Sequence, residues 1–243
     1  MQTISPYDYL PYSWLFERDD LYGYGTEYWG YLDIIAGMVS HLNPQSILDV
    51  GCGHGFMSDF IAKRTQAQVF GIDISERAIT YAKLLSGSAQ FECIELIDIV
   101  RRGWKFDCVL AIEVLEHIDP EQLNGLLDNL IRTVRPGSSL IVSVPSTKKP
   151  VIRPDHFQHF TEEGILNLLA SNSLRPEKIV FQHDVRFQRR ARRYRRLLRN
   201  RYYRLTFLEQ YLVGLYFRKH NRMDTGGRAG RFIIQASCDN IQT

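Results

Sequence analysis

The sequence predicts an α/β fold in which helices cover both faces of a parallel, doubly wound sheet of seven strands. Three observations lead to this prediction. Short runs rich in β-branched residues alternate with helical patterns along most of the 243 residues. Several predicted strands are almost wholly apolar, for example residues 109–112 and 140–142, as expected where helices bury both faces of a sheet. A glycine-rich stretch, residues 51–55, follows the first predicted strand, where the chain turns toward a helix.

The predicted elements follow one another in a regular order. A helix from Thr26 to His41 comes first and ends before Asn43-Pro44, since proline does not continue a helix. The seven predicted strands are Ser46–Val50, Gln68–Ile74, Gln90–Leu96, Phe106–Glu113, Ser139–Pro145, Glu177–Asp184 and Arg231–Cys238. The helices predicted between them are Phe56–Thr65, Glu76–Ser86, Pro120–Val134 and Thr161–Ser171.

The stretch from Phe187 to Phe217 interrupts this alternation. Its apolar residues recur at intervals of three and four, which predicts one long helix or two consecutive helices. Ten arginines and no acidic residue lie between Arg186 and Arg204. We interpret the stretch as a basic amphipathic helical insertion before the last strand, followed by a flexible return over residues 224–230. The predicted parts are an aromatic-rich lid and helix (1–44), a core (45–185), the insertion (186–230), and the final strand and tail (231–243).

Charge is distributed unevenly along the chain. Residues 186–243 hold 15 basic and 3 acidic residues, whereas residues 1–185 hold 15 basic and 24 acidic residues. A basic segment attached to an acidic body predicts an anionic partner. No apolar run approaches the roughly 20 residues that span a bilayer, and the N-terminal residues lack the order of a signal peptide. Four dispersed cysteines are typical of reduced thiols. We therefore expect a cytoplasmic protein, in one interpretation peripheral at the inner face of the membrane.

The sharpest motif is ILDVGCGHG, residues 47–55. Glycines at a strand-to-helix turn let the backbone approach a ligand closely, and in dinucleotide-binding folds such a loop faces a pyrophosphate. Here the spacing is GxGxG, and the carboxylate of Asp49 would repel a pyrophosphate but suit an ammonium group. Asp73, 22 residues after Gly51, ends the second strand, where an acid can accept hydrogen bonds from ribose hydroxyls. The motif predicts a ligand with a ribose, a cationic end and no phosphate, and S-adenosylmethionine meets this description.

The order LDVGCGHG, GIDIS and FDCVLAIEVLEHI resembles the class I S-adenosylmethionine-dependent methyltransferases, over about residues 45–185 and the last strand. The resemblance implies a Rossmann-like seven-stranded methyltransferase sheet. It also implies that the cofactor lies against the loop and the strand ends that follow it. The residues expected to bind it are Asp49, Gly51, Cys52, Gly53, Gly55, Asp73, Ile74, Glu95 and Glu113. Among these, Glu95 is assigned to the adenine amine, with Asp98 as the alternative because the sequence is compressed there.

Two clusters of polar residues follow the fourth and fifth predicted strands. Glu113, Glu116 and His117 form the first, and residues 155–161 form the second. Methyl transfer to an oxygen needs a base or a metal to deal with the hydroxyl proton. One interpretation makes His156 or His159 the base, since an imidazole titrates near neutral pH, with Glu113 and His117 as further catalytic candidates. Thr161 is expected to cap a helix.

Two other interpretations remain open for these clusters. Glu113, Glu116, His117 and His156 form a pattern similar to the small-RNA 2′-O-methyltransferases, which use two glutamates and two histidines around a divalent ion. The Phe-Thr that follows here differs from those enzymes, so we do not favour a metal. Alternatively the histidines only brace the edge of the sheet, because EVLEH is also common in methyltransferases without a metal.

The N-terminal aromatic residues and the arginine-rich insertion supply the candidates for acceptor binding. Tyr24, Tyr28 and Trp29 are predicted to line the acceptor pocket. The stretch from Arg186 to Arg204 suits an anionic membrane surface, a nucleic acid, or only packing on the core. The sequence favours O-methylation of a hydroxyl on a sugar, a lipid-linked glycan or a similar metabolite. The alternatives are a metal-dependent RNA 2′-O-methyltransferase and a non-catalytic S-adenosylmethionine-binding module.

Overall fold

A single mixed sheet organises the molecule, in a computed structural model that describes residues 11–15, 17, 18, 25–149, 155–199 and 202–238. Its strand order is β3-β2-β1-β4-β5-β8-β6-β7. The strands are β1 (Ser46–Val50), β2 (Gln68–Asp73), β3 (Gln90–Cys93), β4 (Phe106–Ile112), β5 (Val134–Pro145), β6 (Leu174–Asp184), β7 (Arg222–Met223) and β8 (Ala229–Cys238). The first five run parallel, and β8 runs antiparallel between β5 and β6.

Helices cover both faces of this sheet, as predicted. The α-helices are α1 (Gly25–Leu42), α2 (Phe56–Ala62), α3 (Glu76–Leu85), α4 (Leu96–Arg101), α5 (Leu123–Thr133), α6 (Glu162–Ser171), α7 (Val185–Leu198) and α8 (Thr206–Leu215). Short helical turns are η2 (Tyr12–Leu15), η3 (Leu115–His117), η4 (Pro120–Gln122), η5 (Tyr216–His220) and η6 (Gly226–Arg228). One apolar cluster joins α4, α5 and α6 to the sheet, and a second joins α1 and α2 to the opposite face.

The polar ends of the central strands meet at one edge of the sheet. In a parallel sheet all carboxyl ends point the same way, so the residues after β1, β2 and β4 gather there. β6 ends at this edge too, because Arg231 of β8 pairs with both Pro145 and Gln182. The fold thus places the glycine loop, both histidine-bearing clusters and the start of α7 at the same edge.

The structure corrects several details of the predicted elements. The flexible return expected over residues 224–230 holds η6 and the first residues of β8. The sheet has eight strands rather than seven, because residues 222–223 pair antiparallel with Phe181 and Gln182 and form β7. The predicted strand Gln90–Leu96 ends at Cys93, and α4 begins at Leu96. Leu96 and Ile99 are three residues apart and both are buried, so this short apolar run packs as one helical face.

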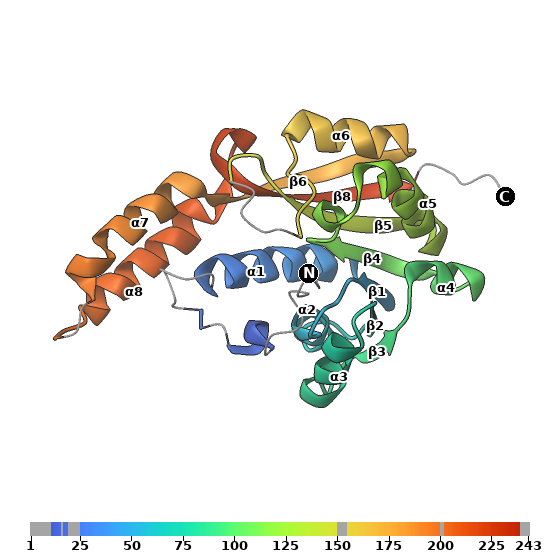
Figure 1. Cartoon of the computed structure of the whole chain (residues 1–243), viewed down its shortest axis with the longest axis horizontal. Helices are drawn as coiled ribbons and strands as arrows, with labels where there is room; N and C mark the ends of the chain where they lie inside the picture. Colours follow the sequence, from blue (N-terminus) through green and yellow to red (C-terminus); the bar gives the residue numbers. More distant parts are fainter. Residues whose placement is uncertain (1–10, 16, 19–24, 150–154, 200–201, 239–243) are drawn as a thin grey trace, which may run out of the picture.

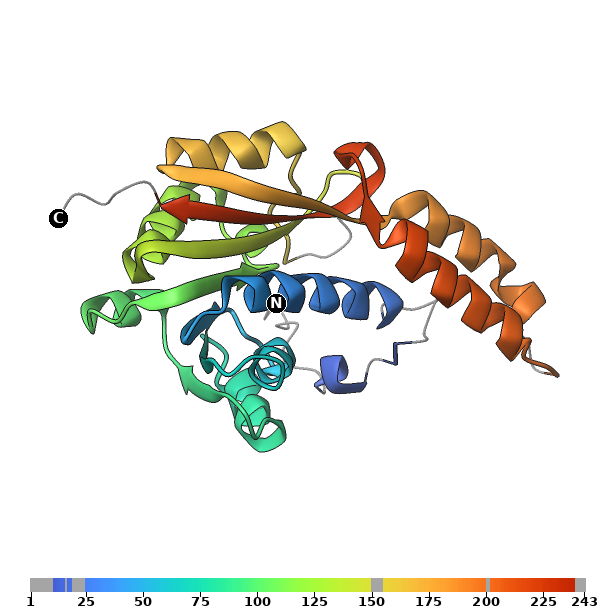
Figure 2. The same cartoon turned by 180° about the vertical axis from the view of Figure 1, so that it is seen from behind.

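The arginine-rich stretch forms two helices. α7 runs outward from the end of β6, and α8 returns beside it, as Figures 1 and 2 both show. The Leu205 N–H donates a 2.8 Å hydrogen bond to the Leu198 carbonyl and closes the turn between them. The pair extends away from the sheet. Within the described residues, we find no helix with the length and apolar character needed to cross a membrane.

Candidate active site

A cavity of about 830 Å³ opens at the carboxyl edge of the sheet, a size typical of ligand pockets. The ends of β1, β2 and β4 form one wall, and α5 with the start of α4 forms another. Of the residues predicted to act here, those that line the cavity are Gly51, Asp73, Ile74, Glu95, Glu113 and His117. These six predicted positions thus meet in one place although they come from four separate segments of the chain.

Glycine is required at the turn after β1. Gly51, Gly53 and Gly55 all have positive φ, which side chains rarely adopt. A Cβ on Gly51 would lie 2.7 Å from the Val114 side chain, which itself lines the cavity. Asp49, Cys52, Gly53 and Gly55 do not line the cavity themselves; they build the turn that supports Gly51. The backbone of the loop therefore approaches the cavity at a point where a side chain would collide with Val114.

Asp73 fixes the glycine loop and faces the cavity. One carboxylate oxygen accepts a 3.0 Å hydrogen bond from the Gly53 N–H, and the other accepts a 2.8 Å hydrogen bond from the Ser75 N–H. Burial raises the pKa of Asp73, although these backbone donors oppose the rise. An ionised carboxylate offers about four acceptor sites, so it retains capacity for ribose hydroxyls. The next residue, Ile74, lines the cavity and is 79% exposed, which suits a flat apolar ring lying over it.

Asp49 lies behind the loop and is almost fully buried. The Ser58 hydroxyl donates a 2.5 Å hydrogen bond to its carboxylate. Burial raises the pKa of Asp49 to about 7, with the nearby Asp73 charge acting in the same direction and the Ser58 hydrogen bond against it. A cationic ligand above the loop would favour the ionised form of this carboxyl.

The position after β3 distinguishes Glu95 from Asp98. Glu95 stands at the start of α4 and lines the cavity, together with Leu96 and Ile97. Asp98 points elsewhere and pairs with Arg101 at 3.0 Å. The geometry therefore favours Glu95 over Asp98 as the acid beside the ligand.

Glu113 is held by Arg231 rather than by the histidines. The guanidinium of Arg231 donates two hydrogen bonds of 2.9 Å, one to each carboxylate oxygen, and the Ser143 hydroxyl donates another of 2.9 Å. Burial alone would raise the pKa of Glu113, but the Arg231 charge and hydrogen bonds hold it below its usual range. A carboxylate so engaged is a poor proton acceptor. The structure therefore does not support the catalytic and metal-ligand roles predicted for Glu113.

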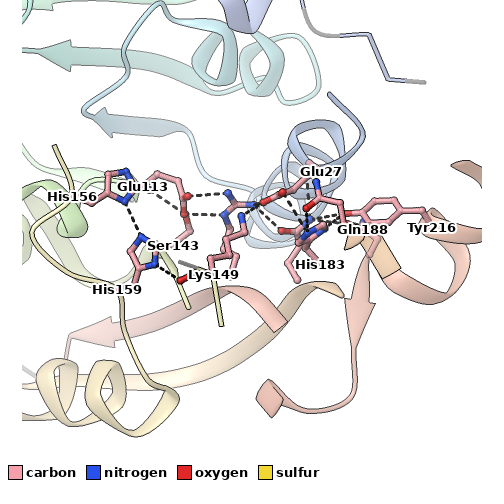
Figure 3. Close-up of polar contacts among 12 residues, drawn as sticks. Glu27, Glu113, Ser143, Lys149, His156, His159, His183, Gln188 and Tyr216 are labelled. Atoms are coloured by element: carbon pink, nitrogen blue, oxygen red, sulfur yellow. Dashed lines mark hydrogen bonds and ion pairs between the residues drawn. The ribbon is translucent and has the colours of Figure 1, made fainter. Parts of the chain in front are cut away.

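The Arg231–Glu113 pair belongs to a larger buried network (Figure 3). Arg231 also contacts Glu27 at 3.2 Å, and Glu27 bonds the Lys149 ammonium. The His183 ring lies 3.5 Å from Glu27, and burial lowers the pKa of His183 to about 4. Burial alone would raise the pKa of Glu27. Because His183 is neutral at pH 7, the charges of Lys149 and Arg231 hold the pKa of Glu27 below its usual range. The network ties α1, β4, β6 and β8 together behind the cavity.

Three histidines near the cavity form an ordered chain. His117 Nδ1 lies 2.9 Å from the Asp155 carbonyl oxygen, His156 Nδ1 lies 3.0 Å from His159 Nε2, and His159 Nδ1 lies 3.0 Å from the Lys149 carbonyl oxygen. Figure 3 shows the second and third of these contacts. A carbonyl only accepts, so His117 and His159 carry their proton on Nδ1. When His159 is neutral, its Nε2 accepts a hydrogen bond from His156 Nδ1. When His117 and His156 are neutral, their ring lone pairs are both on Nε2.

These two histidines meet the buried Glu116. One nitrogen of each ring and one oxygen of Glu116 all lie within 4.8 Å of one another. The rings of His117 and His156 pack edge to face at 4.7 Å between centroids. Three of the four residues of the predicted metal alternative are thus brought together. Imidazole nitrogens with a carboxylate suit a divalent transition metal, so these residues fit one.

Two of the three aromatic candidates of the N-terminal segment, Tyr28 and Trp29, lie away from the cavity. Tyr28 and Trp29 pack on Phe56, with ring centroids 5.8 and 5.5 Å apart, and neither lines the cavity. Their large apolar rings are used in the contact between α1 and α2. Tyr24 lies outside the described residues. Trp14 instead reaches the glycine loop, where its indole N–H donates a 2.8 Å hydrogen bond to the His54 carbonyl.

Phe157 and Arg231 are among the residues at this site that were not predicted from the sequence. Phe157 lines the cavity and is exposed, in the loop whose histidines were singled out. Arg231 was assigned only to the start of the last strand. A charged residue beginning an apolar strand was the signal that could have indicated its buried role.

Comparison with known proteins agrees with this geometry. Residues 47–137 match a family model described as a methyltransferase domain. A ubiquinone biosynthesis O-methyltransferase from Rhizobium etli is 32% identical over 138 residues, which are 55% of this chain and 53% of the relative. One from Coxiella burnetii is 33% identical over 107 residues, covering 42% and 44%. The chain spans about half the length of the curated relatives it matches.

Residues 47–137 carry a domain of the class I S-adenosylmethionine-dependent methyltransferases. This confirms the predicted family and doubly wound fold, and S-adenosylmethionine is the cofactor of this class. Solved methyltransferases share the fold. Magnesium protoporphyrin IX methyltransferase from Synechocystis PCC 6803, solved with bound S-adenosylmethionine, has a TM-score of 0.55 at 19% identity over 93% of this chain and 90% of its own. The methyltransferase domain of bacterial CtHen1-C has a TM-score of 0.58 at 14% identity over 87% and 98%.

Proposed function

We propose that this methyltransferase methylates a hydroxyl oxygen of a sugar, a lipid-linked glycan or a similar metabolite. The observation that carries the proposal is the histidine chain beside the cofactor cavity. The Asp155 carbonyl selects the tautomer of His117 whose lone pair is on Nε2, and such a nitrogen can accept a proton. Relatives named as ubiquinone O-methyltransferases support an oxygen acceptor.

In this proposal different residues of the cavity bind different parts of the cofactor. Asp73 would accept hydrogen bonds from the ribose, Glu95 from the adenine amine, and the Gly51 backbone would lie against the methionine part. When bound, S-adenosylmethionine supplies an electrophilic methyl group that passes to the acceptor oxygen. The enzyme's own contribution is to position the acceptor and to receive its proton.

His117 is the proton acceptor in this proposal, since it lines the cavity whereas His156 and His159 do not. Its Nδ1–H is held by the Asp155 carbonyl, and an Asp155 carboxylate oxygen at 3.4 Å would stabilise the imidazolium that forms. His156, held by His159, would accept the proton in turn or brace the ring of His117. The sequence favoured His156 or His159 as the base, and in this proposal both support His117 instead.

The test measures transfer of a labelled methyl group to sugar, isoprenoid-linked sugar and phenolic acceptors. His117→Asn is expected to lower kcat by about 10²–10⁴-fold, the usual contribution of a general base. It should leave binding of S-adenosylhomocysteine unchanged. His41→Asn, an exposed histidine on α1, is the matched control. Full turnover in His117→Asn, or no transfer to any hydroxyl acceptor by the wild type, would contradict the proposal. The latter result would favour a non-catalytic binding module.

A second candidate function is a metal-dependent RNA 2′-O-methyltransferase. The cluster of Glu116, His117 and His156 favours it, and the fold is shared with bacterial CtHen1-C. In this candidate the three residues would hold a divalent ion beside the acceptor oxygen. Calorimetric titration with Mn²⁺ separates the candidates without any acceptor. Mn²⁺ binding that is lost in Glu116→Gln and kept in Glu163→Gln would support the metal-dependent candidate. The absence of Mn²⁺ binding would leave the candidate in which His117 accepts the proton.

A further inference from the structure

The α7–α8 hairpin, comprising α7, α8 and the described residues between them (199 and 202–205), carries a surface that the methyl-transfer site does not use. α7 contains no acidic residue, and its exposed arginines include Arg189, Arg190, Arg192 and Arg193. The acid of α8, Glu209, is buried and paired with Arg204. Its charge therefore does not compensate the arginines of α7, and the hairpin presents cationic side chains to its surroundings.

Large apolar side chains are exposed on the same hairpin. Tyr202 is 87% exposed, Phe207 84% and Leu197 62%, and Tyr194, Tyr203, Leu205, Leu208 and Tyr211 are exposed as well. The apolar cluster between the two helices is small: Ala191 and Val213 are buried in it, and Phe187, Leu212 and Phe217 are partly buried against them. The exposed set belongs to the end of α7 and the start of α8, which is the part of the hairpin farthest from the sheet (Figures 1 and 2).

We propose that the α7–α8 hairpin docks the enzyme on an anionic membrane surface, with its arginines on lipid headgroups and its distal apolar side chains in the bilayer interface. Arginine meets phosphate through two or more donors. Tyrosine, phenylalanine and leucine beside basic residues are the composition of helices that lie in the membrane interface.

The leucines favour a bilayer over a nucleic acid. Tyrosine and phenylalanine rings can stack on bases, but Leu197, Leu205 and Leu208 have no face that stacks. These aliphatic side chains leave water when they enter the acyl boundary of a bilayer, and that transfer is favourable. Charge complementarity with anionic lipid and the exposed aliphatic side chains thus point to the same partner.

The position of the hairpin also suits the delivery of a substrate to the cavity. α7 begins directly after β6, and β6 ends at the sheet edge where β5 ends and the cavity opens. Docking through the hairpin would hold that edge near the membrane, where a lipid-linked acceptor would reside. The docking inference itself goes beyond the proposed reaction and does not depend on which hydroxyl is methylated.

Vesicle co-sedimentation of the full chain tests the inference. Vesicles of phosphatidylcholine with about 30% phosphatidylglycerol are compared with pure phosphatidylcholine and with a short single-stranded RNA, each at about 0.05 and 0.3 M salt. We expect binding to the anionic vesicles, weakened by salt because exposed charges are screened within about 10 Å at 0.1 M. The quadruple change of Arg189, Arg190, Arg192 and Arg193 to Gln should weaken it at least about 100-fold, since each basic residue near anionic lipid contributes about fivefold.

Two matched controls separate the hairpin from the charge and apolarity of the whole protein. Arg77→Gln with Arg101→Gln, Arg132→Gln and Arg175→Gln removes the same charge from the body. Leu84→Ser with Leu85→Ser, at two exposed leucines of α3, matches the pair Phe207→Ser with Leu208→Ser. Only the hairpin variants should lose vesicle binding, while all variants keep S-adenosylhomocysteine binding.

If a hairpin variant fails to fold, its loss of vesicle binding says nothing about docking. A variant that adds a fluorescence signal tests docking in that case. Phe207→Trp should add a fluorescence emission that shifts to the blue on anionic vesicles and is quenched by brominated acyl chains. The inference is overturned if the wild type binds no vesicle, if the body and hairpin variants lose binding equally, or if the introduced indole remains in water on bound vesicles. RNA binding tighter than vesicle binding, insensitive to Phe207→Ser with Leu208→Ser, would overturn it in favour of a nucleic acid.

Discussion

Arg231 donates two hydrogen bonds of 2.9 Å to the two carboxylate oxygens of Glu113, and the pair joins the end of β4 to the start of the apolar part of β8. Arg231 is fully buried, and its guanidinium also lies 4.3 Å from the centre of the Tyr31 ring. Glu113 has a positive φ, which is unfavourable for a side-chain-bearing residue. The pair therefore holds the turn after β4, from which Val114 and His117 reach the cavity.

Replacing Arg231 tests how much this ion pair contributes to the free energy of unfolding. Arg231→Met leaves Glu27 and Glu113 buried without their shared cation, and breaking a buried ion pair from one side costs about 3–5 kcal/mol. We expect a loss of this size in the free energy of unfolding, measured in urea at pH 7. Arg135→Met, which breaks the surface pair with Asp107, should cost about 1 kcal/mol or less. Equal losses in the two variants would contradict the account.

His183 makes stability depend on pH in a defined window. Its folded pKa is lowered to about 4 by burial, against 6.5 when exposed. Between these values His183 is protonated in the unfolded chain but not in the folded protein. The free energy of unfolding therefore falls as the pH decreases from 6.5 toward 4. Between about pH 6.5 and about pH 5 we expect a loss of about 1–2 kcal/mol in the unfolding free energy. His183→Asn should flatten this slope, and an unchanged slope would show that another group titrates.

Asp49 should make cofactor affinity rise with pH. With a pKa of about 7 its carboxyl is mostly protonated at pH 6 and mostly ionised at pH 8. Only the ionised form attracts a cationic ligand, so affinity for S-adenosylmethionine should increase by roughly tenfold between these values. Calorimetry across this range measures it. The rise should disappear in Asp49→Asn; if it persists there, Asp49 is not its source.

Much of the fold could be predicted because apolar runs and glycine turns are local signals. β1 was placed at its observed bounds, and the helices and strands around it were found with small errors at their ends. α4 was missed because its apolar residues span too short a run to show a helical period. β7 has two residues and no pattern at all, since it exists only through pairing with β6.

The site was predicted in part for the same reason. The strand ends located Gly51, Asp73, Glu95 and His117 at the cavity, since parallel strands bring their carboxyl ends together. The role of Glu113 could not be read from its neighbours, because its partner lies 118 residues away on an antiparallel strand. The tautomers of the histidines likewise depend on carbonyl oxygens that only the folded loop supplies.

Calorimetric titration of S-adenosylmethionine into three proteins tests the central claim, that this cavity binds the cofactor through the strand-end acids. The wild type should bind in the micromolar range, and Asp73→Ala should bind more weakly by about 1–3 kcal/mol, the cost of losing a charged hydrogen-bond partner. Asp98→Ala, which changes a neighbouring acid that does not line the cavity, should bind as the wild type does. Equal affinity in Asp73→Ala and the wild type, or no binding by the wild type, would contradict the account.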